Sequence, residues 1–286
     1  MTKRALLVGI NYPGTEHELN GCVNDALIMS DLITTHFDFI DAKNRRMLVD
    51  SSATTDNILE RLEWLVDGCS PGDVLFFHYS GHGSQMINQN YDDPDFYVDG
   101  LDEVICPVDI NWRNKVIRDD DLKRIFDKVP DGVSVTVILD CCHSGGGLDS
   151  LTRYQPLGLK RFVPTPAVSP NRSRYLPMPP DIANRGIGLG LRSKPRKVQT
   201  RDTSTALLIS GCGESQISAD SYINNVYAGA ATFYIAKSLK DNNFEIDYKT
   251  LVEKAARSLA DAGYSQQPEL NGRGDLFSNR FLQPLI

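Results

Sequence analysis

The chain reads Val74-Leu-Phe-Phe-His-Tyr-Ser-Gly-His-Gly83 about a quarter of the way along its 286 residues. A second stretch of the same kind follows, Val133-Ser-Val-Thr-Val-Ile-Leu-Asp-Cys-Cys-His-Ser-Gly145. Each begins as an almost continuous apolar run and ends in His, Cys and Gly residues. Apolar runs of this length are typical of strands in parallel sheets, which are covered on both faces. Both stretches therefore predict buried strands with reactive side chains at their carboxyl ends.

Further elements alternate along the chain outside these two stretches. The predicted strands are Ala5–Ile10, Arg46–Val49, Val74–Ser80, Val133–Asp140 and Ala206–Cys212. Between them, apolar residues recur with helical spacing over residues 23–33, 58–69, 122–129 and 251–259, and Thr54 or Thr55 is a candidate N-cap. The alternation predicts an α/β fold, a three-layer α/β/α sandwich with a mostly parallel central sheet.

Composition narrows the class of protein. A hydrophobic fraction of 41% and a charged fraction of 23% are ordinary for a globular protein, and a net charge of -7 argues against binding to nucleic acid. No apolar run is long enough to span a membrane, and the apolar run after Lys3 and Arg4 is interpreted as a first strand. The six cysteines show no CxxC spacing, so we expect a reducing, cytoplasmic location.

Residues 151–205 interrupt the pattern. This segment contains eight of the fifteen prolines and eleven Lys or Arg residues against two acids, so it carries +9 while the rest carries -16. A long stretch without apolar periodicity is usually functional or disordered. We interpret it as an exposed basic linker between regions 1–150 and 206–286, which together form one domain. A solvated linker without further function remains the alternative.

The ends of the two strands provide a nucleophile and a base. Parallel strands bring His82 and the cysteines to the same sheet edge. Because side chains alternate along a strand, Cys142 shares a face with Asp140, whereas Cys141 points into the opposite layer. We therefore pair Cys142 with His82, which can activate the thiol, and expect Gly145–Gly147 to offer N–H groups to an oxyanion. The alternative is that both cysteines are buried packing residues and His82 lies in a turn.

Several blocks resemble those of one family. His-Tyr-Ser-Gly-His-Gly (78–83) and Asp-Cys-Cys-His-Ser-Gly (140–145) are similar to the two signature blocks of metacaspases, in the caspase-like clan of cysteine peptidases. Residues 6–14, 21–25, 102–109 and 217–220 are similar to further blocks. The resemblance implies large-subunit and small-subunit regions joined by the linker, in a form without an N-terminal prodomain. It leaves the metacaspase subtype open.

Two acids flank the proposed nucleophile. Asp25 follows the first strand, and Asp140 lies two residues before Cys142. Carboxylates there favour a basic substrate side chain over an acidic one. The resemblance implies that these positions, with Cys22 and Ser80, line a pocket for the Arg or Lys before the cut. For Asp25, a role as a helix cap is the alternative.

A second acid set follows from the resemblance alone. Asp102, Asp119, Asp120 and Asp149 are similar in position to the calcium ligands of calcium-dependent metacaspases. Carboxylate oxygens are the ligands that Ca²⁺ prefers, although no EF-hand spacing is present. We therefore expect calcium to activate the protein.

These observations together predict a monomeric, calcium-activated endopeptidase that cleaves proteins or peptides after Arg or Lys. The basic linker is its expected first substrate, with cuts among Arg153, Lys160, Arg161, Arg172 and Arg174. Two alternatives are a catalytically silent scaffold, against which the retained Cys142 and His82 argue, and an Asp-specific caspase, against which Asp25 and Asp140 argue.

Overall fold

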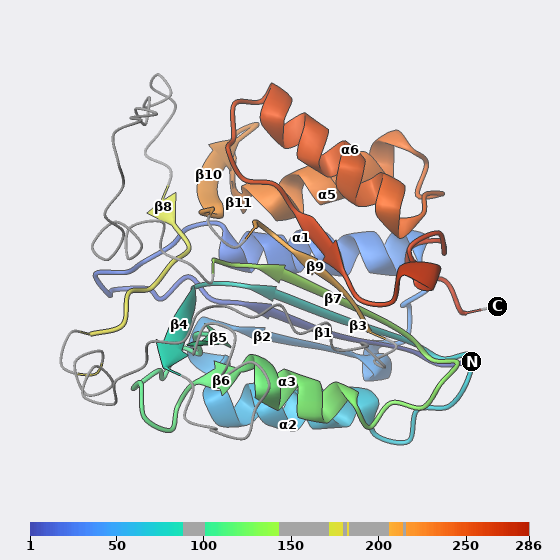
Figure 1. Ribbon diagram of the computed structural model, residues 1–286, viewed down its shortest axis with the longest axis horizontal. Coiled ribbons are helices and arrows are strands. Elements are labelled where there is room, and N and C mark those ends of the chain that lie inside the picture. Colours follow the sequence, from blue (N-terminus) through green and yellow to red (C-terminus); the bar gives the residue numbers. More distant parts are fainter. Residues whose placement is uncertain (88–100, 143–171, 180–181, 183–205, 214–215, 286) are drawn as a thin grey trace, which may run out of the picture.

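A six-stranded sheet forms the centre of the molecule (Figure 1). The computed structural model describes the chain except residues 88–100, 143–171, 180–181, 183–205, 214–215 and 286. The order of strands is β12-β9-β7-β3-β1-β2, and their bounds are Glu269–Asn271, Ala206–Ser210, Ser134–Asp140, Val74–Ser80, Lys3–Gly9 and Arg45–Val49. All neighbouring pairs are parallel except β12 with β9. The order reverses around β1, a place where α/β sheets form sites at the carboxyl edge.

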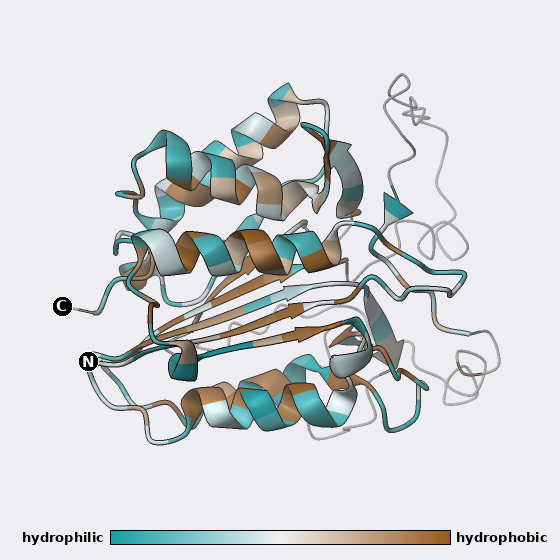
Figure 2. Cartoon of the chain, turned by 180° about the vertical axis from the view of Figure 1, so that it is seen from behind, coloured by the Kyte–Doolittle hydropathy of each residue, from teal (hydrophilic) through white to brown (hydrophobic). Residues whose placement is uncertain are grey.

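Helices cover both faces of this sheet (Figure 1). One layer contains α1 (Cys22–His36), α5 (Ala230–Asp241) and α6 (Tyr248–Asp261), and the other contains α2 (Thr55–Val66) and α3 (Asp119–Phe126). Short 3-10 helices lie at Ala42–Asn44, Asp50–Ser52 and Gly274–Leu276. Figure 2 shows that hydrophobic residues predominate on the strands, whereas each helix mixes hydrophobic and hydrophilic residues. This is the pattern expected when a sheet is buried between amphipathic helices.

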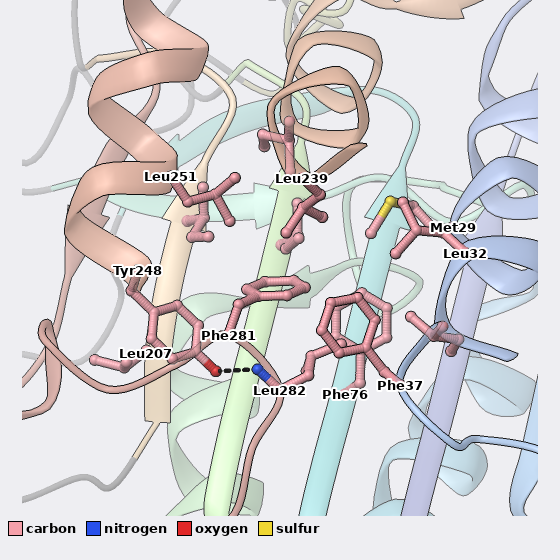
Figure 3. Close-up of a cluster of buried hydrophobic side chains, with 14 of the residues drawn as sticks. Met29, Leu32, Phe37, Phe76, Leu207, Leu239, Tyr248, Leu251, Phe281 and Leu282 are labelled. Carbon is pink, nitrogen blue, oxygen red and sulfur yellow. Dashed lines mark hydrogen bonds between the residues drawn. The ribbon is translucent and has the colours of Figure 1, made fainter. Parts of the chain in front are cut away.

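Alternate residues of the inner strands β1, β3 and β7 enter different cores. Leu7, Phe76 and Ile138 pack in the cluster under α1, α5 and α6, a part of which Figure 3 shows around Phe37 and Phe281. Their neighbours in sequence, such as Leu6 and Phe77, pack in the cluster against α2 and α3. These three strands are therefore buried on both faces, because each carries apolar residues on both sides of the sheet.

Two small sheets extend the fold beyond the predicted elements. One has the order β4-β5-β6 (Gly83–Ile87, Leu101–Ile105, Ile117–Arg118), and the other has the order β11-β10-β8 (Val226–Gly229, Ala219–Ile223, Arg172–Ser173). In Figure 1 the arrowheads of β3 and β7 point toward the side of the molecule on which β4 and β8 lie. Both small sheets therefore border the carboxyl edge of the central sheet.

The predicted three-layer α/β architecture is confirmed, with small shifts of bounds. All five predicted strands are present, but Ile10, Val133, Gly211 and Cys212 lie just outside them. Thr54 is the N-cap of α2, and its side chain accepts a hydrogen bond from the Asn57 N–H at 3.3 Å. The helix α5 and both small sheets were not predicted. Among the described residues, no helix is both long enough and apolar enough to span a bilayer.

The prediction of an exposed linker is wrong for Arg174 and Leu176, although Arg172, Ser173 and Pro177 beside them are exposed. The side chains of Arg174 and Leu176 are 0% and 5% exposed. Strand β8 pairs antiparallel with β10, so the chain here is part of a sheet. Composition could not show this, because a basic, Pro-rich stretch can still contain two or three residues that bind a matching surface.

Candidate active site

Cys142 and His82 lie at the carboxyl ends of neighbouring strands. Strands β3 and β7 pair in parallel with Ser80 opposite Asp140, and both candidate residues follow two positions later. Cys141 packs in the apolar cluster against α2 and α3, so it points away from Cys142, as strand alternation predicted. The Ser218 N–H donates to Cys142 Sγ at 2.5 Å, which holds the thiol in place. Both side chains are buried.

His82 is held as a base with a defined proton position. Its Nε2 lies 2.7 Å from the His17 carbonyl oxygen, which can only accept, so Nε2 carries the proton. Its Nδ1 is buried and has no hydrogen-bond partner among the described residues. Burial lowers the pKa of His82 to about 4, with the His17 carbonyl acting in the opposite direction. The ring is therefore neutral at physiological pH, with a free lone pair on Nδ1.

Two tyrosines hold the backbone of this histidine. The His82 N–H donates to the Tyr12 hydroxyl at 3.0 Å, and the Tyr79 hydroxyl donates to the His82 carbonyl at 2.7 Å. The Tyr12 ring also packs on the imidazole, with 4.7 Å between centroids. The Tyr12 hydroxyl in turn donates to the Cys106 carbonyl at 2.5 Å. Because the rings of Tyr12 and Tyr79 are both buried, this network restricts the movement of His82 and its imidazole.

Two backbone N–H groups converge on one carbonyl oxygen at the site. The N–H groups of Gly83 and Cys142 point to the Arg174 carbonyl, at 2.9 Å and 3.4 Å. A Cβ at position 83 would lie 2.4 Å from the Cys142 carbonyl oxygen, so only glycine allows this approach. Paired N–H donors of this kind can hold a developing oxyanion. Sequence reasoning had placed these donors at Gly145–Gly147, which lie outside the described residues.

The Arg174 side chain occupies a buried acidic pocket. Its guanidinium lies 2.8 Å from Asp25, 3.0 Å from Asp220 and 3.3 Å from Asp140. It also donates to the Ser80 hydroxyl at 2.7 Å. All four acceptor side chains are buried. The pocket thus brings together the predicted residues Asp25, Asp140 and Ser80, and it adds Asp220.

Asp25 and Asp140 are not electrostatically equivalent. Burial raises the pKa of Asp25 to about 7, although the Arg174 charge acts to lower it. Burial also acts to raise the pKa of Asp140, but Arg174 and hydrogen bonds from Ser218 and Thr232 hold it below its usual value. Three carboxyl groups thus face one guanidinium, and Asp25 protonates before Asp140 as the pH falls.

Cys22 lines the same pocket without an ion pair of its own. It is the first residue of α1 and is fully buried. Burial raises the pKa of its thiol, while the nearby Arg174 charge lowers it. The alternative role of Asp25 as a helix cap does not hold, because the N-cap of α1 is Gly21 and Asp25 instead accepts from the Gly229 N–H at 2.9 Å.

The second acid set is brought together only in part. Asp102 lies on β5, and Asp119 and Asp120 begin α3, directly after the β6 strand that pairs with β5. Burial raises the pKa of Asp119 to about 7, and the charges of Asp120, Asp102 and Glu103 add to the effect. Among the described residues, no group of three or more potential ligands is arranged to hold a metal ion. Asp149 lies outside the described residues.

Several functional groups were missed from the sequence. The His17 carbonyl is a backbone atom and leaves no trace in the sequence. Asp220 had a weak signal, because it ends the 217–220 block, yet no role was assigned to it. Arg174 was predicted as a point of cleavage but not as the occupant of the pocket. Its partners Asp25 and Asp140 are 149 and 34 positions away, which local patterns cannot connect.

Comparisons with known proteins agree with these features. A family model for the metacaspase peptidase C14 domain matches residues 3–151. Metacaspase-1 of Schizosaccharomyces pombe is 30% identical over 300 residues, covering 94% of this chain and 67% of that protein. Metacaspase-1 of Lodderomyces elongisporus is 35% identical, covering 94% of this chain and 64% of that protein. Metacaspase-2 of Trypanosoma brucei brucei is 32% identical, covering 94% of this chain and 73% of that protein.

The chain thus spans about two thirds of the length of these relatives. A solved structure also has the same fold. The crystal structure of protein GSU0716 from Geobacter sulfurreducens aligns with a TM-score of 0.68 at 24% identity, and all of both chains is covered. At this identity the likeness supports the architecture alone.

Proposed function

The chain belongs to the metacaspase family of cysteine-type endopeptidases, and we propose that it cuts after Arg or Lys, is activated by calcium and cuts its own linker after Arg174. One observation supports both the preference for basic residues and the cut after Arg174. The Arg174 side chain fills the acidic pocket while its carbonyl oxygen accepts from the Gly83 and Cys142 N–H groups. This is how a substrate residue before a scissile bond would bind.

The arrangement supports a thiol mechanism. Nδ1 of His82 takes the proton of the Cys142 thiol, and the sulfur attacks the carbonyl carbon of the residue in the pocket. The charge that develops on the carbonyl oxygen is stabilised by the N–H groups of Gly83 and Cys142. His82 then returns the proton to the leaving amine, the peptide bond breaks and a thioester remains on Cys142. Attack by water, with His82 again as base, releases the acid product and restores the thiol.

Specificity for basic residues follows from the charges of the pocket. Three buried carboxylates surround the position of the substrate cation, and an acidic side chain there would meet only repulsion. The planar guanidinium reaches all three acids with two nitrogens, which the single ammonium of Lys does less completely. We therefore propose that Arg is preferred to Lys and that Asp is rejected.

Self-cleavage is proposed at the Arg174–Tyr175 bond. Of the predicted cut sites, Arg172 is exposed, and Arg153, Lys160 and Arg161 lie outside the described residues. Arg174 alone among the described residues of the linker places both its side chain and its carbonyl in the site. Until the bond is cut, the linker also excludes other substrates from the pocket. Self-cleavage would therefore precede cleavage of other proteins.

Calcium activation is proposed from the acids of β5 and α3. Asp102, Asp119 and Asp120 lie close enough for the charges of the other two to raise the pKa of Asp119. A divalent cation would relieve this repulsion and is bound by carboxylate oxygens. Asp149, the fourth predicted ligand, comes seven positions after Cys142 in the sequence and lies outside the described residues.

Paired fluorogenic peptides test the proposed function. Peptides that end in Arg, Lys or Asp before a coumarin amide are incubated with the purified chain, with calcium or with a chelator. We expect cleavage of the Arg and Lys peptides with calcium, little with chelator, and none by the Cys142→Ala variant. Equal cleavage of the Asp peptide would contradict the specificity, and full activity in chelator would contradict the calcium proposal.

A further inference from the structure

Leu176 of the linker fills an apolar pocket beside the active site. Its side chain is 5% exposed and packs in one cluster with Met86, Val104, Cys106 and Val116. These four residues come from β4, from β5 and from the chain next to β5 and β6. Apart from Leu176 and the partly buried Met178, the members of this cluster belong to the β4–β6 region. The linker thus contributes the occupant, and the body of the protein contributes the walls.

The backbone around the proposed cut follows a fixed, extended path. The Gly83 N–H donates to the Arg174 carbonyl, and the Leu176 N–H donates to the Gly83 carbonyl, each at 2.9 Å. Tyr175 therefore forms a parallel bridge with Gly83. Arg174 and Leu176 are buried, whereas Ser173 and Pro177 are exposed. This alternation is that of a strand laid on a surface, with every second side chain in a pocket.

The apolar pocket is connected to the catalytic histidine through the backbone. Strand β4 begins at Gly83, the residue after His82, and the Cys106 N–H donates to the His82 carbonyl at 3.0 Å. The position of the pocket relative to the cut is therefore set by the same backbone that sets the position of the base. Any peptide that binds with its carbonyl at Gly83 and continues along the same path will bring its second residue after the cut to this pocket.

We propose that Met86, Val104, Cys106 and Val116 form a binding site for an apolar side chain at the second position after the cut, in protein substrates as well as in the linker. The inference rests on the proposed function, because it takes Arg174–Tyr175 as the scissile bond. Leu, Met or a similar aliphatic side chain would gain burial there. Asp or Glu would lose its hydration without a partner in the apolar walls.

Internally quenched peptides test the site. The parent peptide carries the sequence of residues 172–178, Arg-Ser-Arg-Tyr-Leu-Pro-Met. In one series the Leu is replaced by Ala or Asp, and in the control the following Pro is replaced by Asp, since Pro177 is exposed. The full chain is first incubated with calcium until its mass spectrum no longer changes. We expect kcat/KM to fall about tenfold for Ala and further for Asp, while the Pro replacement changes it less than about twofold.

A variant of the apolar pocket tests whether the preference for Leu arises there. In Met86→Ala the ratio of kcat/KM for the Leu peptide to that for the Ala peptide should fall toward unity, because part of the wall is removed. If this variant does not fold, the peptide series with the wild-type protein still tests whether an apolar residue is preferred at the second position after the cut. Cleavage after Arg with equal rates for Leu, Ala and Asp would overturn the inference and leave the proposed function standing. Absence of any cleavage after Arg would instead overturn the proposed function.

Discussion

Arg174→Ala should slow the cut between residues 174 and 175 by two to four orders of magnitude. The side chain is 0% exposed, and its guanidinium lies within 3.3 Å of three buried carboxylates. Removing one partner of such a buried arrangement costs about 3–5 kcal/mol, because the opposite charges remain without a counterion. At about 1.4 kcal/mol for each factor of ten, this corresponds to a rate about 10²–10⁴ times lower.

Intact-mass spectrometry after calcium addition measures this rate directly. Wild type should give two fragments, residues 1–174 and 175–286, that appear together. Arg172→Ala is the matched control, since it removes an exposed Arg two positions earlier whose side chain donates a hydrogen bond to the Glu18 carbonyl and not to the acids of the pocket, among the described residues. It should be cut at nearly the wild-type rate. A cut at the same bond and rate in Arg174→Ala, or loss of the cut in Arg172→Ala alone, would refute the assignment of Arg174.

Three further predictions concern the pocket and the nucleophile. Burial raises the pKa of Asp25 to about 7 even with the Arg174 guanidinium beside it, so this pKa is higher when no cation fills the pocket, and Arg peptides bind the ionised form. Their KM should therefore fall as the pH rises above about 7, a range in which His82 stays neutral, and a pH series that shows the same slope in Asp25→Asn would contradict this. Asp220→Asn keeps an oxygen for the Gly21 N–H but loses a charge, so kcat/KM for Arg peptides should fall about 10- to 100-fold, and an unchanged value would remove Asp220 from the pocket. Cys141→Ala should keep most peptidase activity and lose only about 1 kcal/mol of stability in a denaturant titration, because its side chain is a packing residue, and a folded but inactive variant would show that it has a role in catalysis.

The architecture and part of the site could be predicted because they depend on local periods. The apolar runs predicted β3 and β7, and the period of two along a strand separated Cys141 from Cys142. The site could not be completed in this way, because its closure depends on contacts between distant segments. Strand β8 has only two residues, and nothing in its basic surroundings indicates that the next residue is buried.

Functional backbone groups of the site could not be predicted from the sequence either. The His17 carbonyl sets the proton position of His82, and the Gly83 and Cys142 N–H groups bind the Arg174 carbonyl. Every residue carries such groups, so residue types cannot identify the ones that act. The glycines after Cys142 were a reasonable expectation for the oxyanion donors on composition alone, but among the described residues the two N–H groups that meet this carbonyl belong to other positions.

Covalent labelling tests the central claim, that Cys142 attacks the carbonyl of a basic residue held by the acidic pocket. The chain is treated with an arginyl chloromethyl ketone after calcium addition and digested, and the adduct is located by mass spectrometry. We predict one label per chain on Cys142, none on Cys141 or Cys22, and no reaction with the aspartyl analogue. Label on another cysteine of the wild-type protein, or equal labelling by the aspartyl reagent, would contradict the account.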